Sequence, residues 1–209
     1  MAYKTLLTVA TSKRQLDATV TAAAALAVQM DAHLDLLALG VDRTEVGYSY
    51  IGAGAVALPA DTERAKADAH ALTDAINAAI ARQTPILRWS CETAVTQLRA
   101  LTGLVAHRAR YADLVILAQP FGTDRGPEAE AVVEAALFEG DAPVLVLPDT
   151  GTLTPTPQTV VIAWNQSRAA MASVRRALPM LRAANRVEIA LIDPPVFGTE
   201  RSDPGGLLC

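Results

Sequence analysis

Residues 113–117 read Asp-Leu-Val-Ile-Leu, and this short apolar run is the stretch that decides the fold class. A strand that is apolar on both faces is typical of a parallel sheet covered by helices on both sides. Further strands are expected at residues 6–10, 34–41 and 143–147. Longer segments with helical spacing separate these runs. The alternation predicts βαβ units around an open parallel sheet, an α/β fold.

The intervening segments carry helix signals. We expect the first helix to begin in a capping box, because Ser12 is followed three residues later by Gln15. Its sheet-facing side is predicted to consist of Leu16, Val20, Ala23, Ala24 and Ala27. A half-polar third strand is expected at residues 86–90. The other helices are expected from residue 61 or 62 to just before Pro85, around residues 98–105, and over residues 127–138.

The pattern restarts after a linker. Residues 149–158 are rich in threonine and proline, which predicts a linker. Residues 159–163 then match residues 5–9, and residues 187–191 match residues 34–38. We therefore expect one complete five-stranded domain over residues 1–148 and the first βαβ unit of a second over residues 159–209. Residues 202–209 resemble the loop into a further unit, so the chain is expected to be part of a longer tandem protein.

Composition excludes several classes of protein. The net charge is −4 and the basic residues are scattered, which argues against nucleic-acid binding. The longest apolar stretch, residues 21–30, is about half the length that a membrane span needs. The N-terminus lacks the pattern of a signal peptide. Two cysteines, Cys91 and Cys209, make neither a disulfide framework nor a metal motif, so a cytoplasmic protein is expected.

The order of these elements, opening with Tyr3-Lys4-Thr5-Leu6-Leu7 and closing with Ala142-Pro143-Val144-Leu145-Val146, resembles the universal stress protein family. The resemblance covers residues 1–148, and the tandem form of the family accounts for residues 159–209. It implies a Rossmann-like fold of the adenine nucleotide alpha hydrolase type. It also implies that any nucleotide lies outside the carboxyl ends of the first and fourth strands.

Members that bind ATP use an aspartate after the first strand and a G-x2-G-x9-G-(S/T) loop after the fourth. Here Thr11 stands in place of the aspartate, and Gly122 and Gly126 are separated by three residues. No serine or threonine occurs between Asp124 and Asp149. Only Arg125 is basic nearby, while Glu128 and Glu130 would repel a triphosphate. We therefore predict a degenerate site at Thr11, Gly122 and Gly126 that binds ATP or AMP weakly or not at all.

Other candidate sites favour a structural interpretation. Gly52 and Gly54 form no phosphate loop, and Tyr48 and Tyr50 are expected to pack on the sheet edge. No metal site is expected, because His33, His70 and His107 fall on separate elements without further ligands at suitable spacing. Cys91 is expected to be a buried small side chain.

Two rival functions lack the residues that they need. A two-component receiver domain requires acidic residues after the first strand and a lysine after the fifth, where this chain has Ala10-Thr11-Ser12 and Leu147-Pro148. A small hydrolase or nucleotidyl transferase acting on ATP would need the missing phosphate loop. A non-enzymatic stress-response protein that acts by binding is therefore expected. The alternative is a universal stress protein that binds ATP or hydrolyses it weakly.

Self-association is also expected. In the resembled family the fifth strand lies at the sheet edge and pairs with its counterpart in a second domain. Here the segment from Pro143 to Leu147 is almost wholly apolar, and the second copy ends before its own fifth strand. An open apolar edge presents unpaired backbone groups to other chains. Dimerisation through this strand is the prediction.

Overall fold

The computed structural model of the protein describes residues 3–43, 59–122, 125–150, 156–192 and 205–208. The chain divides into two compact units, one spanning Tyr3–Leu153 and the other containing Thr154–Cys209. Among the described residues, no helix is long and apolar enough to cross a membrane.

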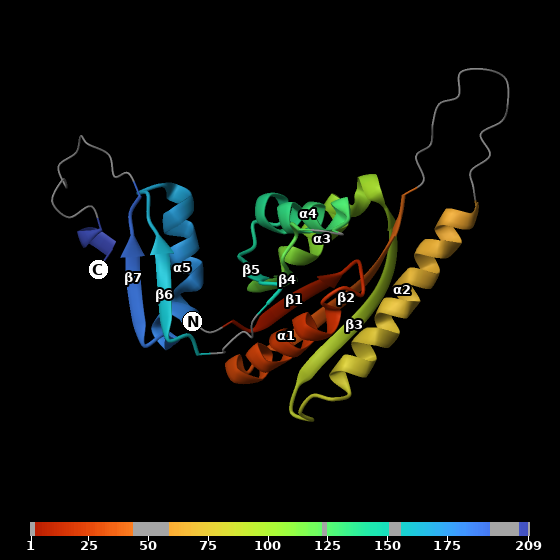
Figure 1. Cartoon of the computed structure of the whole chain (residues 1–209), viewed down its shortest axis with the longest axis horizontal. Coiled ribbons are helices and arrows are strands. Elements are labelled where there is room, and N and C mark those ends of the chain that lie inside the picture. Colours follow the sequence, from red (N-terminus) through yellow and green to blue (C-terminus); the bar gives the residue numbers. More distant parts are fainter. Residues whose placement is uncertain (1–2, 44–58, 123–124, 151–155, 193–204, 209) are drawn as a thin grey trace, which may run out of the picture. The chain divides into compact units, whose positions relative to one another are not determined.

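The first unit is built on a sheet of five parallel strands in the order β3-β2-β1-β4-β5 (Figure 1). The strands are β1 (Thr5–Ala10), β2 (His33–Asp42), β3 (Arg88–Gln97), β4 (Leu114–Ala118) and β5 (Val144–Leu147). The order reverses between β1 and β4, so the connections after these two strands run in opposite directions. This arrangement confirms the predicted open parallel α/β sheet.

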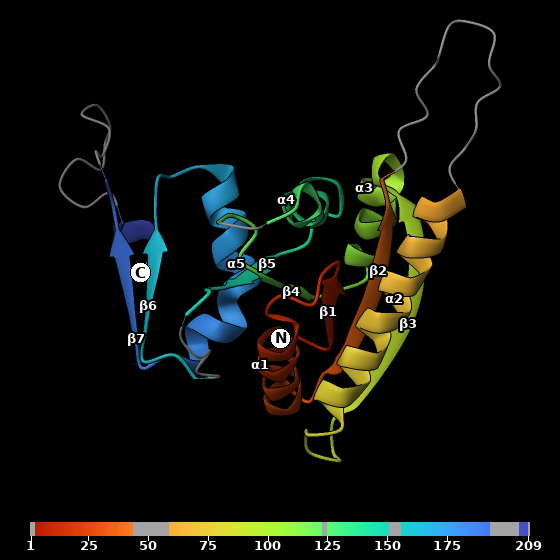
Figure 2. The same ribbon diagram turned by 45° about the vertical axis from the view of Figure 1, so that its right-hand side comes forward.

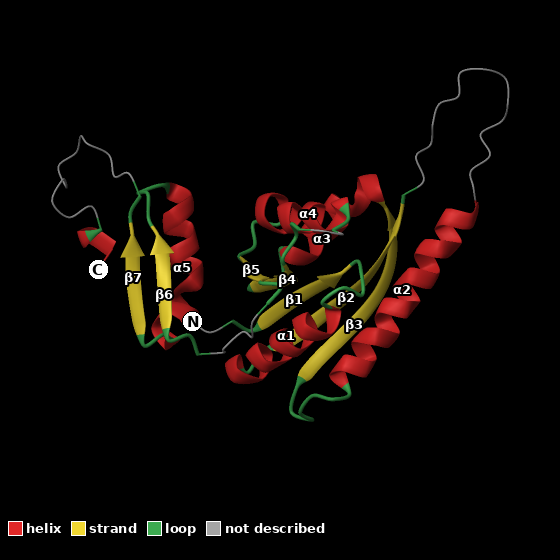
Figure 3. Ribbon diagram, viewed as in Figure 1, coloured by secondary structure: helices red, strands yellow, loops and turns green. Residues whose placement is uncertain are grey.

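Helices cover both faces of this sheet (Figures 2 and 3). They are α1 (Leu16–Met30), α2 (Pro59–Ile80), α3 (Leu98–Ala109) and α4 (Pro127–Glu134), which continues as a π-helical turn, η1 (Ala135–Glu139). The first two pack on one face and the last two on the other. The α1 residues predicted to face the sheet are all buried, which confirms the helical spacing.

The start of α1 differs from the prediction. The helix begins at Leu16, and its N-cap residue is Gln15, which has a φ of 54° and makes no capping hydrogen bond with its side chain. The capping box of Ser12 and Gln15 is therefore wrong. The side-chain amide of Gln15 instead donates from Nε2 to the Asp149 carboxylate, at 2.6 Å, and accepts at Oε1 from the Arg125 guanidinium, at 3.2 Å. A tertiary contact replaces the local cap.

The third strand is longer and later than predicted. It runs over Arg88–Gln97 and pairs with β2 residue by residue, from His33–Arg88 to Asp42–Gln97. The strand continues past the predicted end at residue 90 through polar residues, namely Glu92, Thr93, Thr96 and Gln97. A strand can hold polar side chains here because β3 is an edge strand, and most of its side chains remain exposed. The last helix also departs slightly, because its final turn is π-helical.

The second unit is a single βαβ unit. It consists of β6 (Thr159–Ala163), α5 (Arg168–Ala183) and β7 (Arg186–Ala190), followed by the 3-10 turn η2 (Gly206–Leu208). Its strands are parallel, with Thr159 opposite Arg186 and Ala163 opposite Ala190. β6 has the predicted bounds, and β7 begins one residue before the predicted segment 187–191. Ser167 caps α5 by accepting a hydrogen bond from the Ala170 amide at 3.0 Å.

Candidate ligand-binding site

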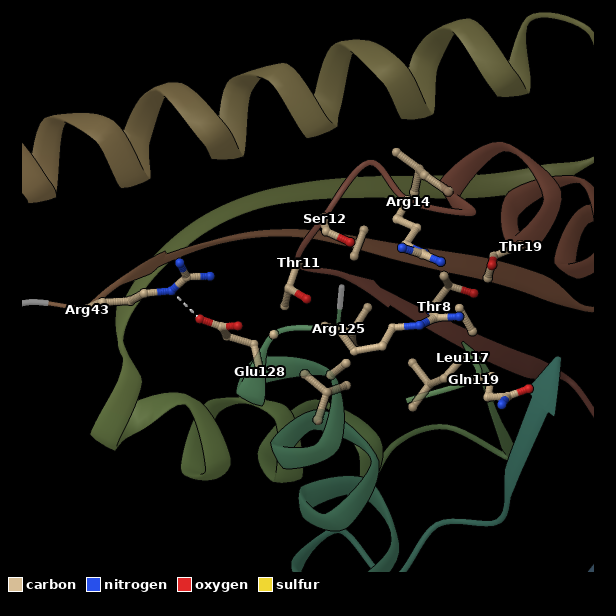
Figure 4. Close-up of a pocket in the computed structure, with 17 residues that line it drawn as sticks. Thr8, Thr11, Ser12, Arg14, Thr19, Arg43, Leu117, Gln119, Arg125 and Glu128 are labelled. Carbon is tan, nitrogen blue, oxygen red and sulfur yellow. Dashed lines mark hydrogen bonds and ion pairs between the residues drawn. The ribbon is translucent and has the colours of Figure 1, made fainter. Parts of the chain in front are cut away.

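A cavity of about 250 Å³ lies in the first unit at the carboxyl ends of β1 and β4 (Figure 4). Ligands of parallel α/β sheets bind where the strand order reverses, because the diverging loops leave a crevice there. The strands contribute Thr8, Val9 and Ala10 from β1 and Leu117 and Ala118 from β4. Loops and helix starts complete the walls, and apolar side chains such as Leu16 and Val132 line much of the interior.

The structure brings together two of the three predicted site residues. Thr11 and Gly126 both line the cavity, whereas Gly122 is not among its lining residues. Gly122 has a φ of 133°, a backbone conformation that favours glycine, so its role is in the turn itself. Gly126 has an ordinary φ of −79°. A Cβ atom there would overlap Oε2 of Glu128, so glycine at this position leaves room for that carboxylate.

Glu128 is buried inside the cavity rather than solvated at a helix start. Its side chain is 5% exposed, and its carboxylate accepts a hydrogen bond from the guanidinium of Arg43. This contact raises the pKa of Arg43 above its ordinary value. Figure 4 shows the pair at one side of the cavity. A negative charge therefore lies in the first turn of α4, at the helix N-terminus that would otherwise favour a bound anion.

Arg125 is the second buried charge of the site. Its side chain is 9% exposed, and its guanidinium donates to Asp149 through Nη2 and to Gln15 through Nη1. The hydrogen bond from Arg125 is the main reason that the pKa of Asp149 lies below its ordinary value. Through these two hydrogen bonds the guanidinium connects the loop after β4 to Gln15, at the start of α1, and to Asp149, just after β5.

Among the residues that the structure describes, two buried polar atoms of the cavity wall have no hydrogen-bond partner. They are Nε of Arg125 and Oγ1 of Thr8. Thr8 is 1% exposed and belongs to the cavity lining. A buried polar group without a partner costs about 1–3 kcal/mol, and such groups usually have a ligand or an ordered water as their partner. The cavity therefore offers two donors to a bound molecule.

Several polar lining residues were not assigned to the site by the sequence analysis. Arg125 was expected to be the only basic residue nearby, but Arg14 and Arg43 also line the cavity, and Thr8 lies in its wall. Arg43 follows the carboxyl end of β2 directly, which is a signal that could have been used. The position of Thr8 had no such signal, because an apolar strand with one threonine is compatible with either face.

The other candidate residues behave as structural groups. The ring of His33 lies 3.3 Å from the Asp35 carboxylate and 3.3 Å from the Ser90 hydroxyl, in both cases through Nε2. A Ser-His-Asp triad needs the carboxylate on the other ring nitrogen, so this cluster has the wrong geometry for nucleophilic catalysis. The ring of His107 packs edge-on against Tyr111 at 5.5 Å. The first cluster connects β2 to β3, and the second contact lies at the C-terminal end of α3.

Cys91 is half-buried rather than fully buried, and burial raises the pKa of its thiol, which makes it a poor nucleophile. Within the described ranges, no group of three or more histidine, cysteine or acidic side chains could hold a metal ion. Tyr48, Tyr50, Gly52 and Gly54 lie outside the described residues.

Comparison with solved structures places the first unit among known folds. The chain is similar to the universal stress protein UspA from Lactobacillus plantarum, with 22% sequence identity and a TM-score of 0.51, over 70% of this chain and 99% of that one. A weaker match is a universal stress protein in complex with cAMP, with 18% identity and a TM-score of 0.41, over 72% of this chain and 100% of that one. Another is a universal stress protein from Archaeoglobus fulgidus, with 12% identity and a TM-score of 0.40, over 70% of this chain and 94% of that one.

No family model matches the sequence, and no curated protein matches it. At this level of identity, the likeness to the Lactobacillus plantarum protein establishes a shared fold. The first unit therefore has the fold of universal stress proteins.

Proposed function

We propose that the protein is a universal stress protein that acts by binding rather than by catalysis, and that its nucleotide site is degenerate. The fold supports the family, since one solved universal stress protein matches at a TM-score of 0.51 over 99% of its length. The buried carboxylate of Glu128 is the observation that carries the proposal on the site. It lies at the start of α4, next to Gly126, where the family's phosphate loop would hold an anion.

The energetic argument concerns charge. A triphosphate at this position would face Glu128 across a few ångströms, and the carboxylate has already taken the Arg43 guanidinium as its partner. The guanidinium groups of Arg43 and Arg125 are both already paired with carboxylates, so neither offers its full positive charge to a triphosphate. The cavity is also small, since about 250 Å³ is below the roughly 300–1,000 Å³ of sites for drug-sized ligands. Both features disfavour ATP.

The test is whether nucleotide stays with the protein. The purified chain is denatured, and the supernatant is read by absorbance and mass spectrometry. Calorimetric titration with ATP and AMP and an assay of phosphate release follow on the same sample. We expect no stoichiometric nucleotide, no low-micromolar dissociation constant and no phosphate release. A low-micromolar constant for ATP that is lost in Gly126→Ala would instead favour the alternative, an ATP-binding or ATP-hydrolysing protein.

The second unit is proposed to be the first βαβ unit of a second domain of the same type. Its register supports this, because the pairing of Thr159 with Arg186 in β6 and β7 corresponds to the pairing of Thr5 with His33 in β1 and β2. Expression of residues 1–150 alone tests the division. We expect that fragment to fold cooperatively, since β1 to β5 and α1 to α4 all lie within it.

Self-association and a cytoplasmic location complete the proposal. β5 is at the edge of the sheet, where the described residues give it one neighbouring strand, β4, and its apolar Val146 is 40% exposed. Such an edge can pair with the same strand of a second molecule. The free thiol of Cys91 fits a reducing compartment. Fractionation of cells that produce the native chain tests the location.

A further inference from the structure

We propose that the cavity binds a small organic monoanion, with a carboxylate seated between Arg125 and Thr8 and an uncharged body directed toward Glu128. This inference deepens the proposed function and rests on it, because it assigns a ligand class to the site that ATP does not fill. The observation behind it is the pair of unpartnered polar atoms in the described part of the cavity wall.

The two atoms offer complementary hydrogen bonds to one group. Nε of Arg125 is a donor, and the Thr8 hydroxyl donates as well. A carboxylate has two oxygen atoms and can accept from both at once. Since Nη1 and Nη2 of Arg125 are already bonded to Gln15 and Asp149, the guanidinium cannot swing away to find another partner. The donor is therefore held in place before a ligand arrives, which lowers the entropic cost of binding.

Charge favours an anionic group at the end of the cavity where Figure 4 shows Arg125 and Arg14, away from Glu128. In Figure 4 the Arg125 guanidinium points away from the side where Glu128 and Arg43 form their pair. An anionic oxygen next to Arg125 gains a charge-assisted hydrogen bond. A second anionic group at the other end of the ligand would meet the buried Glu128 carboxylate. The cavity thus has one anion-accepting end and one anion-rejecting side.

Size and surface point to a compact body. The cavity measures about 250 Å³, and its apolar lining includes Leu16, Leu117 and Val132. A flat or short apolar group can pack against these three side chains, which leaves the polar part of the lining to the anionic end of the ligand. A sugar or a phosphate chain would place several hydroxyl or phosphoryl oxygens against these side chains, at a cost for each group without a partner.

Two matched pairs of probes test the assignment on the full chain. Benzoate and benzamide differ in the charge of one end. Terephthalate and 4-carbamoylbenzoate have nearly the same shape and differ in the charge of the far end. The side-chain Nε–H resonance of Arg125, assigned with the Arg125→Lys variant, reports binding directly by NMR. We expect benzoate to bind about tenfold more tightly than benzamide, which corresponds to about 1.4 kcal/mol, and to move this resonance downfield.

The second pair and one variant complete the test. Terephthalate is expected to bind more weakly than 4-carbamoylbenzoate because of Glu128. Thr8→Val should weaken benzoate binding about threefold to tenfold, the contribution of one hydrogen bond, while the folded protein stays at least as stable, since a buried unpartnered hydroxyl is removed. Thr93→Val, on β3 and away from the cavity, is the matched control and should leave benzoate binding unchanged.

The outcomes separate this inference from the proposed function. Equal affinities of benzoate and benzamide, or benzoate binding that Thr8→Val leaves unchanged, would overturn the monoanion assignment alone. ATP is titrated in the same samples. A low-micromolar constant for ATP would overturn the degenerate site, whatever the result with the carboxylates.

Discussion

The carboxylate of Glu128 and the guanidinium of Arg43 form an ion pair, although 85 residues separate them in the sequence. The pair connects the end of β2 to the first turn of α4 across the side of the cavity. Only one partner is buried, since the side chain of Arg43 is 65% exposed and that of Glu128 is 5% exposed. Removing the charge of Glu128 should therefore change the charge inside the cavity more than removing that of Arg43 would.

Replacing Glu128 with glutamine should make the site more receptive to nucleotides. The substitution keeps the shape of the side chain, removes the buried negative charge and frees Arg43 to contact a phosphate. We expect the affinity for ATP to rise by about tenfold, or roughly 1.4 kcal/mol, measured by calorimetry at fixed ionic strength. Glu130→Gln, at an exposed position in the same helical turn, is the control and should have little effect. Equal affinities of the two variants would contradict the role given to Glu128.

Gly40 and Gly103 should respond oppositely to alanine. A Cβ on Gly40 would clash with the carbonyl group of Ala65, so Gly40→Ala forces α2 away from β2. We expect a loss of about 3 kcal/mol in the free energy of unfolding, from overpacking of this contact. Gly103 lies in α3, and a Cβ added to it would meet no described atom within 4 Å, so Gly103→Ala should add about 0.5–1 kcal/mol. Urea unfolding measures both, and a stable Gly40→Ala protein would argue against this packing.

Stability should fall at alkaline pH because of Tyr3. Burial, with a smaller contribution from Asp113, raises the pKa of Tyr3 to about 12 in the folded protein. An unfolded tyrosine has a pKa near 10, so the stabilising contribution is complete below about pH 10 and is lost as the pH rises toward 12. Tyr3→Phe should remove this part of the pH dependence in urea unfolding. Tyr111→Phe, at an exposed tyrosine, should retain it.

A lysine in β5 should weaken the proposed self-association. Leu145 is only half-buried in the edge strand, and a charge there opposes pairing with a second chain. We expect sedimentation at micromolar concentration to show a dimer for the unaltered protein and a shift toward monomer for Leu145→Lys. Val95→Lys, in the opposite edge strand β3, is the matched control. Dissociation by Val95→Lys alone would assign the contact to β3, and a monomer before any mutation would end the proposal.

Two errors of the sequence analysis have different physical causes. The third strand was predicted to end at residue 90, but it continues through Glu92, Thr93, Thr96 and Gln97, because an edge strand leaves polar side chains in water. Gln15 was assigned to a local capping box, but its amide bonds to Arg125 and Asp149, which are distant in the sequence. Local signals predict local partners, and they fail where a distant group competes successfully for the same atoms.

The sequence by itself determined the α/β class, the order of strands and helices, and the place of each βαβ unit, because hydrophobic periodicity is a property of neighbouring residues. Thr11 and Gly126 were located at the cavity through the resemblance to the universal stress protein family, which implies a site at the carboxyl ends of the first and fourth strands. Only the tertiary structure decided the charge of the cavity. The burial of Glu128, its pairing with Arg43 and the unpartnered atoms of Thr8 and Arg125 arise from segments that meet in space and are far apart along the chain.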